Sequence, residues 1–158
     1  MIYLGIGSNL GNRRKNIEKA KFKIIQNKIK IIQSSNYYES LSWPNIKNPK
    51  FLNIVLKVNT KIEPLKLIKI FKSIEKSLGR RKANRNSPRE CDIDILDYKG
   101  RQINKEIILP HPRLHKRNFV LFPLFELDKS WKHPISKHHI KKLIKYLSNR
   151  DIRSIKQI

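Results

Sequence analysis

The chain has 158 residues, with 36 Lys or Arg against 12 Asp or Glu, so its formal net charge at pH 7 is +24. This length suits one domain, residues 1–158, and it allows a core that needs no disulfide or structural metal. The single cysteine, Cys91, excludes a disulfide framework and a Cys/His metal cluster, and it favours a reducing cytoplasm. The N-terminal residues are expected to form a strand and turn rather than a signal peptide, and no apolar run approaches the roughly 18 residues of a membrane span.

The excess positive charge has two possible explanations. One is an anionic partner such as nucleic acid, a phosphate compound or a membrane surface. The other is compositional drift, because Lys, Ile and Asn dominate the chain and all have A/T-rich codons. Drift is the favoured explanation for most of the charge, since lysines are scattered along the whole chain. The arginines between Arg80 and Arg89 are an exception because they are clustered.

The N-terminal segment predicts a strand followed by a helix. MIYLGIG is typical of a strand over residues 2–7, which ends in a Gly-Ser-Asn turn. Asn12 is a suitable cap for the helix that follows. Within that helix, Ile17, Ala20 and Ile24 recur at spacings of three and four and form one apolar face.

Two more strands are predicted around a long loop. Residues 29–38 and 51–60 have the β-branched and aromatic character of strands, and the second of these nearly alternates. Residues 39–50 contain two prolines and are expected to form a loop. Loops of this length inside a compact domain are usually functional or disordered.

A second helix is predicted to begin at Pro64 and to end at Gly79. Its buried stripe consists of Leu67, Phe71, Ile74 and Leu78. An arginine-rich loop over residues 80–89 follows, and DIDIL at 92–96 is the fourth predicted strand.

The resulting order, β-α-β-β-α-β, predicts an α+β fold of the ferredoxin-like type. Such a fold has an antiparallel four-stranded sheet with helices on one face. Residues 115–127 and 137–147 add two short helices near the C-terminus.

The strand ECDIDIL carries two acidic residues in an otherwise basic zone. Side chains alternate along a strand, so Asp92 and Asp94 point one way while Ile93 and Ile95 point into the core. Two carboxylates about 7 Å apart at the backbone can share a cation, and oxygen ligands without His or Cys favour Mg²⁺. The alternative is a solvated strand face with two ordinary charges.

The loop before this strand supplies five basic side chains: Arg80, Arg81, Lys82, Arg85 and Arg89. Arginine forks match phosphate oxygens, and carboxylate-bound Mg²⁺ beside several guanidinium groups is typical of phosphoryl-transfer sites. A generic basic loop is the alternative, but it does not explain why arginine concentrates here while lysine prevails elsewhere.

Four motifs together resemble the 6-hydroxymethyl-7,8-dihydropterin pyrophosphokinases of folate synthesis, over nearly the whole chain. The motifs are GSNLG at 7–11, FLN at 51–53, the run from Arg80 to Leu96 that ends in DIDIL, and LPHPRLHKRNFVLFPLFEL at 109–127. The resemblance implies transfer of the diphosphate of ATP to the hydroxymethyl group of the pterin, with release of AMP. It also implies two Mg²⁺ ions, ATP as co-substrate, a cytoplasmic monomer and no membrane or specific nucleic-acid partner.

Site residues follow from the resemblance by position. The metal ligands are Asp92 and Asp94, and Arg80 and Arg89 act in catalysis. The ATP contacts are Lys82, Arg85, Arg89, His111 and Arg117. The pterin contacts are Ser40, Leu41, Trp43, Phe51, Asn53 and Phe119, with the two phenylalanines sandwiching the ring. Taken singly, Phe51 and Phe119 also fit a plain core, His111 a turn cap and Asn53 a local backbone contact.

The chain departs from the family pattern in the loop before the metal strand. The family reads R-W-G-P-R, whereas Arg85 to Arg89 reads R-N-S-P-R in a loop one residue shorter. The tryptophan that helps a lid to close is therefore missing. A family arginine is replaced by Lys82, and Ser40 and Leu41 replace a Thr and a Pro. These changes predict an active enzyme with impaired closure.

Two other functions stay open at this point. A basic ferredoxin-like sheet with Tyr37 and Tyr38 is compatible with RNA binding, although no RNP-type run is present. A catalytically weakened relative would keep the fold and lose turnover. Cys91 is expected on the apolar side of its strand, where burial raises the pKa of a thiol and makes it inert.

Overall fold

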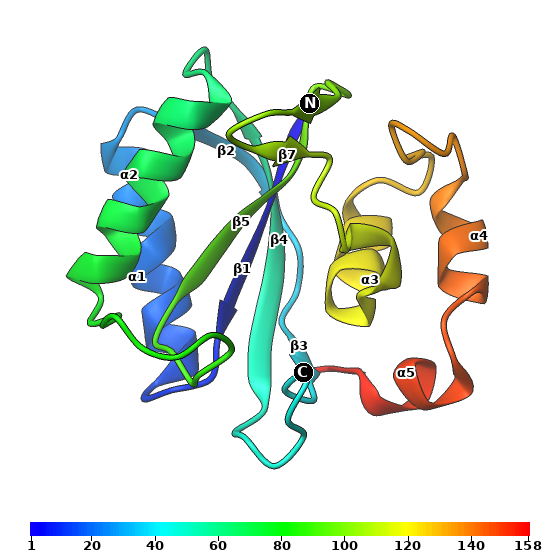
Figure 1. Ribbon diagram of the computed structural model, residues 1–158, viewed down its shortest axis with the longest axis horizontal. Coiled ribbons are helices and arrows are strands. Elements are labelled where there is room, and N and C mark those ends of the chain that lie inside the picture. The colour runs from blue at the N-terminus through cyan, green and yellow to red at the C-terminus, as the bar shows by residue number, and fades with distance from the viewer.

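A six-stranded antiparallel sheet lies between two groups of helices, as the computed structural model of residues 1–158 shows (Figure 1). The strands of this sheet are β1 (Ile2–Ser8), β2 (Lys30–Ser34), β3 (Tyr38–Ser40), β4 (Phe51–Asn59), β5 (Asp92–Tyr98) and β8 (Lys156–Gln157). The helices are α1 (Arg13–Gln26), α2 (Pro64–Ser77), α3 (Asn118–Leu127), α4 (Ile140–Lys145) and α5 (Asn149–Ser154). A hairpin of β6 (Ile103–Asn104) and β7 (Ile108–Leu109) and a 3₁₀ turn at Leu114–Lys116 complete the chain.

The sheet has the predicted ferredoxin-like order. β1 lies in the centre between β5 and β4, and both β2 and β3 pair with β4 on its other side. Because directly opposed residues of an antiparallel pair share a face, the register places Asp92, Gly7 and Asn53 in one row across three strands. The Asp92 side chain of β5 and the Asn53 side chain of β4 therefore project from the same face of the sheet.

The first face of the sheet is covered by α1 and α2. The row formed by Ile6, Ile54 and Ile93 points to these helices and belongs to one buried core of 19 residues. Asn12 caps α1 as predicted, because its side chain accepts a hydrogen bond from the Lys15 backbone N–H at 3.0 Å. Pro64 is the first residue of α2, and Gly79, with φ +107°, follows that helix as predicted.

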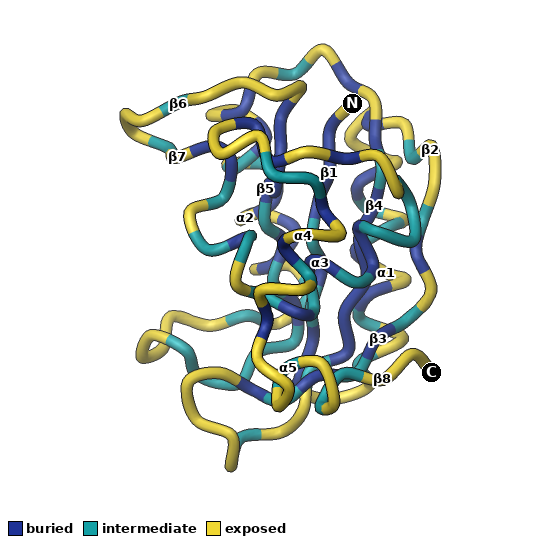
Figure 2. Tube along the Cα trace, turned by 90° about the vertical axis from the view of Figure 1, so that its right-hand side faces the viewer, coloured by how far each residue is buried: buried dark blue, intermediate teal, exposed yellow.

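The second face is covered by α3 and α4, which Figure 2 shows in front of the buried strands β1 and β4. A bulge in β5 opposite Tyr3 and Leu4 turns both Leu96 and Asp97 toward this side. There the Trp131 indole N–H donates to the buried Asp97 carboxylate at 2.9 Å, and the Tyr3 hydroxyl donates to Asp128 at 2.7 Å. These contacts anchor the C-terminal third to the sheet.

The strand predicted over residues 29–38 is two strands, which is a correction. The Ser35 side chain causes the interruption, because its hydroxyl oxygen accepts the Val55 backbone N–H at 2.9 Å in place of a carbonyl. The second of these strands, β3, extends to Ser40. The loop predicted over 39–50 therefore begins at Leu41.

The C-terminal region also differs from the prediction. The helix predicted over 115–127 begins at Asn118 after the 3₁₀ turn, and the helix predicted over 137–147 is only Ile140–Lys145. The hairpin β6–β7, α5 and β8 were not predicted. These short elements lack a periodic apolar pattern, so tertiary contacts decide them, as when β8 pairs with β3. The longest helices have 14 residues each, too few and too polar to cross a bilayer.

Trp131→Phe tests the anchoring of the second face. The change leaves the buried Asp97 carboxylate without its indole donor, so we expect the free energy of unfolding to fall by about 1–3 kcal/mol. Urea denaturation followed by circular dichroism measures the effect. Trp43→Phe is the matched control, because Trp43 is 59% exposed and its change should stay within about 0.5 kcal/mol. Equal stabilities of the two variants would contradict the anchoring role.

Candidate active site

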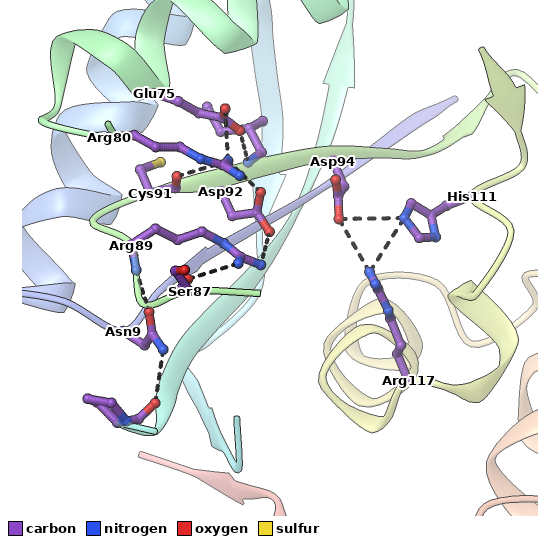
Figure 3. Close-up of polar contacts among 12 residues, drawn as sticks. Asn9, Glu75, Arg80, Ser87, Arg89, Cys91, Asp92, Asp94, His111 and Arg117 are labelled. Atoms are coloured by element: carbon purple, nitrogen blue, oxygen red, sulfur yellow. Dashed lines mark hydrogen bonds and ion pairs between the residues drawn. The ribbon is translucent and has the colours of Figure 1, made fainter. Parts of the chain in front are cut away.

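Asp92 lies between two arginines at the start of β5 (Figure 3). Its Oδ1 is 2.9 Å from Arg80 Nη1, and its Oδ2 is 2.9 Å from Arg89 Nη2. Burial opposes ionisation of this carboxyl, but the charges of Arg89 and Arg80 outweigh burial and lower the pKa of Asp92. Asp92 is therefore charged at neutral pH, and it gathers the predicted catalytic arginines.

Glu75 of α2 completes this network, and the sequence analysis missed it. Its Oε1 accepts the Ile93 backbone N–H at 2.8 Å, and its Oε2 is 2.9 Å from Arg80 Nη1. Arg80 is thus held between a helix carboxylate and a strand carboxylate. Burial raises the pKa of Glu75 against the opposing charge of Arg80. The signal was available, because Glu75 follows Phe71 by four residues and so lies on the buried stripe of α2.

Asp94 has different partners on the α3 side of the cleft (Figure 3). Its Oδ2 is 3.3 Å from Arg117 Nη1 and 3.7 Å from His111 Nε2. Burial and the charge of Asp92 raise the pKa of Asp94 to about 6, although Arg117 opposes the shift. Burial, together with the charges of Arg117 and Arg113, lowers the pKa of His111 to about 4, so this imidazole is neutral at pH 7.

The two carboxylates suit a hard divalent cation. They project from one face of β5 into the same cleft, and their oxygens are ligands that Mg²⁺ accepts. No third Asp, Glu, His or Cys side chain joins them in a metal-binding group. A cation held by Asp92 and Asp94 would therefore take its other ligands from phosphates and water, as Mg²⁺ commonly does.

An aromatic cleft of about 690 Å³ adjoins the carboxylates. Phe51 from the start of β4 and Phe119 from the first turn of α3 line it, and both are half-buried. The Arg89 Cζ lies 5.3 Å from the Phe51 ring centroid, and the Arg117 Cζ lies 5.4 Å from that of Phe119. The charged and aromatic parts of the site are thus in direct contact, and a cleft of this size suits a small planar ligand.

Asn53 presents one polar atom to the cleft. Its Nδ2 donates to Ser40 Oγ at 2.9 Å and to the Tyr38 carbonyl at 3.2 Å, which leaves Oδ1 as a free acceptor. Opposite it, Gly7 allows close packing, since a Cβ there would lie 3.1 Å from Asn53 Oδ1 and 3.3 Å from Phe51 Cδ1. The GSNLG motif therefore contributes space as well as a turn.

The structure gathers most of the predicted site residues but leaves two apart. The cleft is lined by Leu41, Trp43, Phe51, Asn53, Arg89, Asp92, Asp94, Arg117 and Phe119. Ser40 supports Asn53, and His111 contacts Asp94. Lys82 and Arg85 are exposed on the arginine loop, and Arg85 lines a smaller hollow of about 300 Å³ along that loop, which shares Arg89 with the cleft. Arg113, which lies within the motif at 109–127 but was not predicted as a site residue, also lines the cleft.

Paired half-buried carboxylates, surrounding arginines and an adjoining aromatic cleft define the class of site found in metal-dependent phosphoryl-transfer enzymes. A sequence model of the family described as "7,8-dihydro-6-hydroxymethylpterin-pyrophosphokinase (HPPK)" matches residues 3–129. The chain belongs to this family. The matched region contains every predicted site residue.

Individual relatives agree with this assignment. The chain is 40% identical to the 2-amino-4-hydroxy-6-hydroxymethyldihydropteridine pyrophosphokinase of Aquifex aeolicus, over 89% of this chain and 88% of that protein. It is 35% identical to the Methylorubrum extorquens protein of the same name, over 79% and 80% of the two chains. The fold also matches a Plasmodium falciparum HPPK-DHPS crystal structure with TM-score 0.79 and 17% identity, covering 99% of this chain and 45% of that one. The chain thus spans about half the length of these fused structures.

Gly7→Ala tests the packing of the aromatic side of the cleft. The added Cβ would press on Asn53 Oδ1 and Phe51, so both side chains must shift by a few tenths of an ångström. We expect the KM for the ligand of the aromatic cleft to rise by about tenfold, while the KM for nucleotide changes less than about twofold. Gly100→Ala is the control: its φ of +69° strains an alanine, but nothing lies within 4 Å of the added Cβ at this exposed turn outside the cleft, so neither KM should change. An equal rise in both KM values would contradict this expectation.

The raised pKa of Asp94 predicts that nucleotide binding supported by a cation depends on pH. Its pKa is raised to about 6, so the carboxylate is charged above that pH and protonated below it. We expect Mg²⁺-dependent binding of a non-hydrolysable ATP analogue to weaken as the pH falls from about 7.5 to about 5. Calorimetric titration measures the affinity.

Asp94→Asn separates this effect from protonation of the nucleotide, which is common to both proteins. The ratio of wild-type to variant affinity should shrink as the pH falls. A ratio that stays constant over this range would rule out Asp94 as the titrating group.

Proposed function

We propose that the protein transfers the diphosphate of ATP to the hydroxymethyl group of 6-hydroxymethyl-7,8-dihydropterin and releases AMP. The observation that carries the proposal is the placement of Asp92 and Asp94 on one sheet face, between a shell of arginines and an aromatic cleft. Membership of the pyrophosphokinase family and the names of the relatives support the choice of substrates.

Two Mg²⁺ ions, held by Asp92 and Asp94, are part of the proposal. When bound, they neutralise the polyphosphate and polarise the phosphoryl group that is attacked. The donor set supports this assignment, since both carboxylates offer oxygen ligands from one face of β5 to the same cleft. The hydroxyl oxygen of the pterin attacks the β-phosphorus in line. The bond from the β-phosphorus to the oxygen of the α-phosphate breaks, and AMP leaves with that oxygen.

Arg80 and Arg89 have two partners in this scheme. In the free protein they neutralise Asp92, and their forks become available to phosphate oxygens when Asp92 takes a cation instead. Glu75 keeps Arg80 close during this exchange, because it is bonded to the β5 backbone and to the guanidinium at once. Arg117 and neutral His111 donate hydrogen bonds to the phosphates from the other side of the cleft, where they lie beside Asp94.

The aromatic cleft receives the pterin between Phe51 and Phe119. Stacking on two rings stabilises a flat heteroaromatic by on the order of 1 kcal/mol beyond area burial. The free Oδ1 of Asn53 accepts a hydrogen bond from the amino and lactam N–H groups of the ring edge. Leu41 and Trp43 close the cleft from the loop after β3.

Residues 1–158 act as one pyrophosphokinase domain in this proposal, as a cytoplasmic monomer with small-molecule substrates only. Lys82 and Arg85, exposed on the arginine loop, reach ATP only when that loop moves toward the cleft. The single buried cysteine, whose thiol pKa is raised by burial, supports a reducing compartment and takes no part in the chemistry. Sedimentation of the purified protein tests the monomer.

AMP release is the direct test of the function. The purified protein should release AMP from ATP only when Mg²⁺ and the hydroxymethyl dihydropterin are both present. Asp92→Ala and Asp94→Ala should each lower kcat on the order of 10³-fold, since a bound cation contributes several kcal/mol to such transition states.

Glu106→Ala is the control for these variants, because Glu106 is exposed and outside the cleft, so its kcat should match the wild type. Circular dichroism verifies that all three variants fold. Unchanged kcat in both aspartate variants would refute the metal assignment, and AMP release without pterin would refute the acceptor.

A further inference from the structure

We propose that Arg113 is a positioning residue that holds Trp43 over the mouth of the cleft, so that the indole supplies a third aromatic face for the pterin. The inference rests on the proposed function, because it names the ligand of the aromatic cleft. It adds a residue to which the resemblance assigned no role, although Arg113 lies within the motif at 109–127, and it gives that residue a role in substrate affinity.

The first observation is the exposure of Trp43. Its side chain is 59% exposed, although a tryptophan is usually among the more buried residues of a protein. It lies in the loop between β3 and β4 and lines the same cleft as Phe51 and Phe119, which are only half-exposed. The ring therefore sits where a ligand in the cleft could cover it, and burying it would recover the hydrophobic stabilisation that the free protein lacks.

The second observation is the partner of this ring. The Arg113 Cζ lies 5.2 Å from the centroid of the Trp43 ring, within the range of a cation–π contact. The Trp43 indole N–H makes no hydrogen bond within the protein, which leaves the cation–π contact with Arg113 as the polar interaction of this ring. An indole has two faces, and the one that Arg113 does not cover stays available to a flat ligand.

The third observation is that Arg113 comes from an anchored segment. Its backbone N–H donates to His111 Nδ1 at 3.2 Å, and the next residue, Leu114, is fully buried in the second core. The same segment carries His111 and Arg117, which contact Asp94. The residues that contact Asp94 and the residue that contacts Trp43 therefore come from one stretch of chain, which is anchored by Leu114. Trp43 itself lies in a loop.

Binding measurements with variants at both positions test the proposal. Affinity for the hydroxymethyl dihydropterin is measured with Mg²⁺ and a non-hydrolysable ATP analogue present, and affinity for the analogue is measured alone. Arg113→Ala should weaken pterin binding by about twofold to fivefold, which is the strength of an exposed cation–π contact. Trp43→Ala should weaken it by about tenfold, because the aromatic face itself is lost. The analogue should bind both variants within about twofold of the wild type.

The double variant and a conservative change identify the mechanism. Arg113→Ala combined with Trp43→Ala should bind pterin no more weakly than Trp43→Ala alone, since Arg113 acts through the ring. Arg113→Lys keeps the charge without the planar fork, so it should restore only part of the affinity. Additive losses in the double variant would overturn the proposal, as would an Arg113→Ala variant that loses affinity for the ATP analogue and keeps it for pterin.

A matched pair elsewhere on the surface serves as the control. Lys142 Nζ lies 5.7 Å from the ring centroid of Tyr146, which is 63% exposed on α4 and outside the cleft. Lys142→Ala and Tyr146→Ala should leave pterin affinity unchanged. A loss of the same size in these variants would show that exposed cation–π contacts act only through general stability, and it would overturn the proposal.

Fluorescence gives a readout that a purely structural role would not move. The chain has two tryptophans, so the difference between the wild type and Trp43→Phe reports Trp43 alone. Pterin should quench this component, and an unchanged component at saturating pterin would overturn the proposal. A wild type that binds pterin without needing Arg113 or Trp43 refutes this inference only. A wild type that binds no pterin refutes the proposed function as well.

Discussion

The double ion pair of Asp92 with Arg80 and Arg89 is the interaction on which the site depends. A carboxylate this close to the core stays charged only because two guanidinium groups offset its burial. The same pairing holds two guanidinium groups, which can bind phosphate, beside a carboxylate that can bind a cation. Glu75 extends the arrangement into α2, so the arginine loop is tied to a helix as well as to β5. In the proposed function, the side chains that neutralise one another here are also the ones that bind the substrate.

Register across the sheet joins the two halves of the site. Asp92, Gly7 and Asn53 stand opposite one another on β5, β1 and β4, so the acidic and aromatic regions face the same side. The missing side chain at Gly7 leaves room for Phe51 and Asn53 to approach β1. The arginines then connect the two regions, because the guanidinium group of Arg89 lies over the Phe51 ring and that of Arg117 over the Phe119 ring. A movement of Arg89 or Arg117 would therefore alter the contacts of Phe51 or Phe119.

Sequence patterns predicted the parts of the fold with strong periodicity. The apolar faces of α1 and α2 and the alternation in β5 determine which side of each element is buried, and the structure confirms these assignments. The interruption after β2 escaped prediction because a single serine hydroxyl replaces a backbone carbonyl in the ladder. Elements as short as α5 and β8 carry no periodic signal, and their conformations are stabilised by contacts such as the pairing of β8 with β3.

For the site, the sequence by itself determined the chemistry: two carboxylates on one strand face, an arginine cluster directly before them, and a family whose motifs run through the chain. Alternation along a strand and the donor properties of each side chain are local, so one sequence suffices to infer them. Only the tertiary structure decided the pairings, such as Glu75 with Arg80 and Arg113 with Trp43, and it placed Lys82 and Arg85 away from the carboxylates. Those outcomes depend on packing between elements that are distant in the chain, which local residue patterns do not encode.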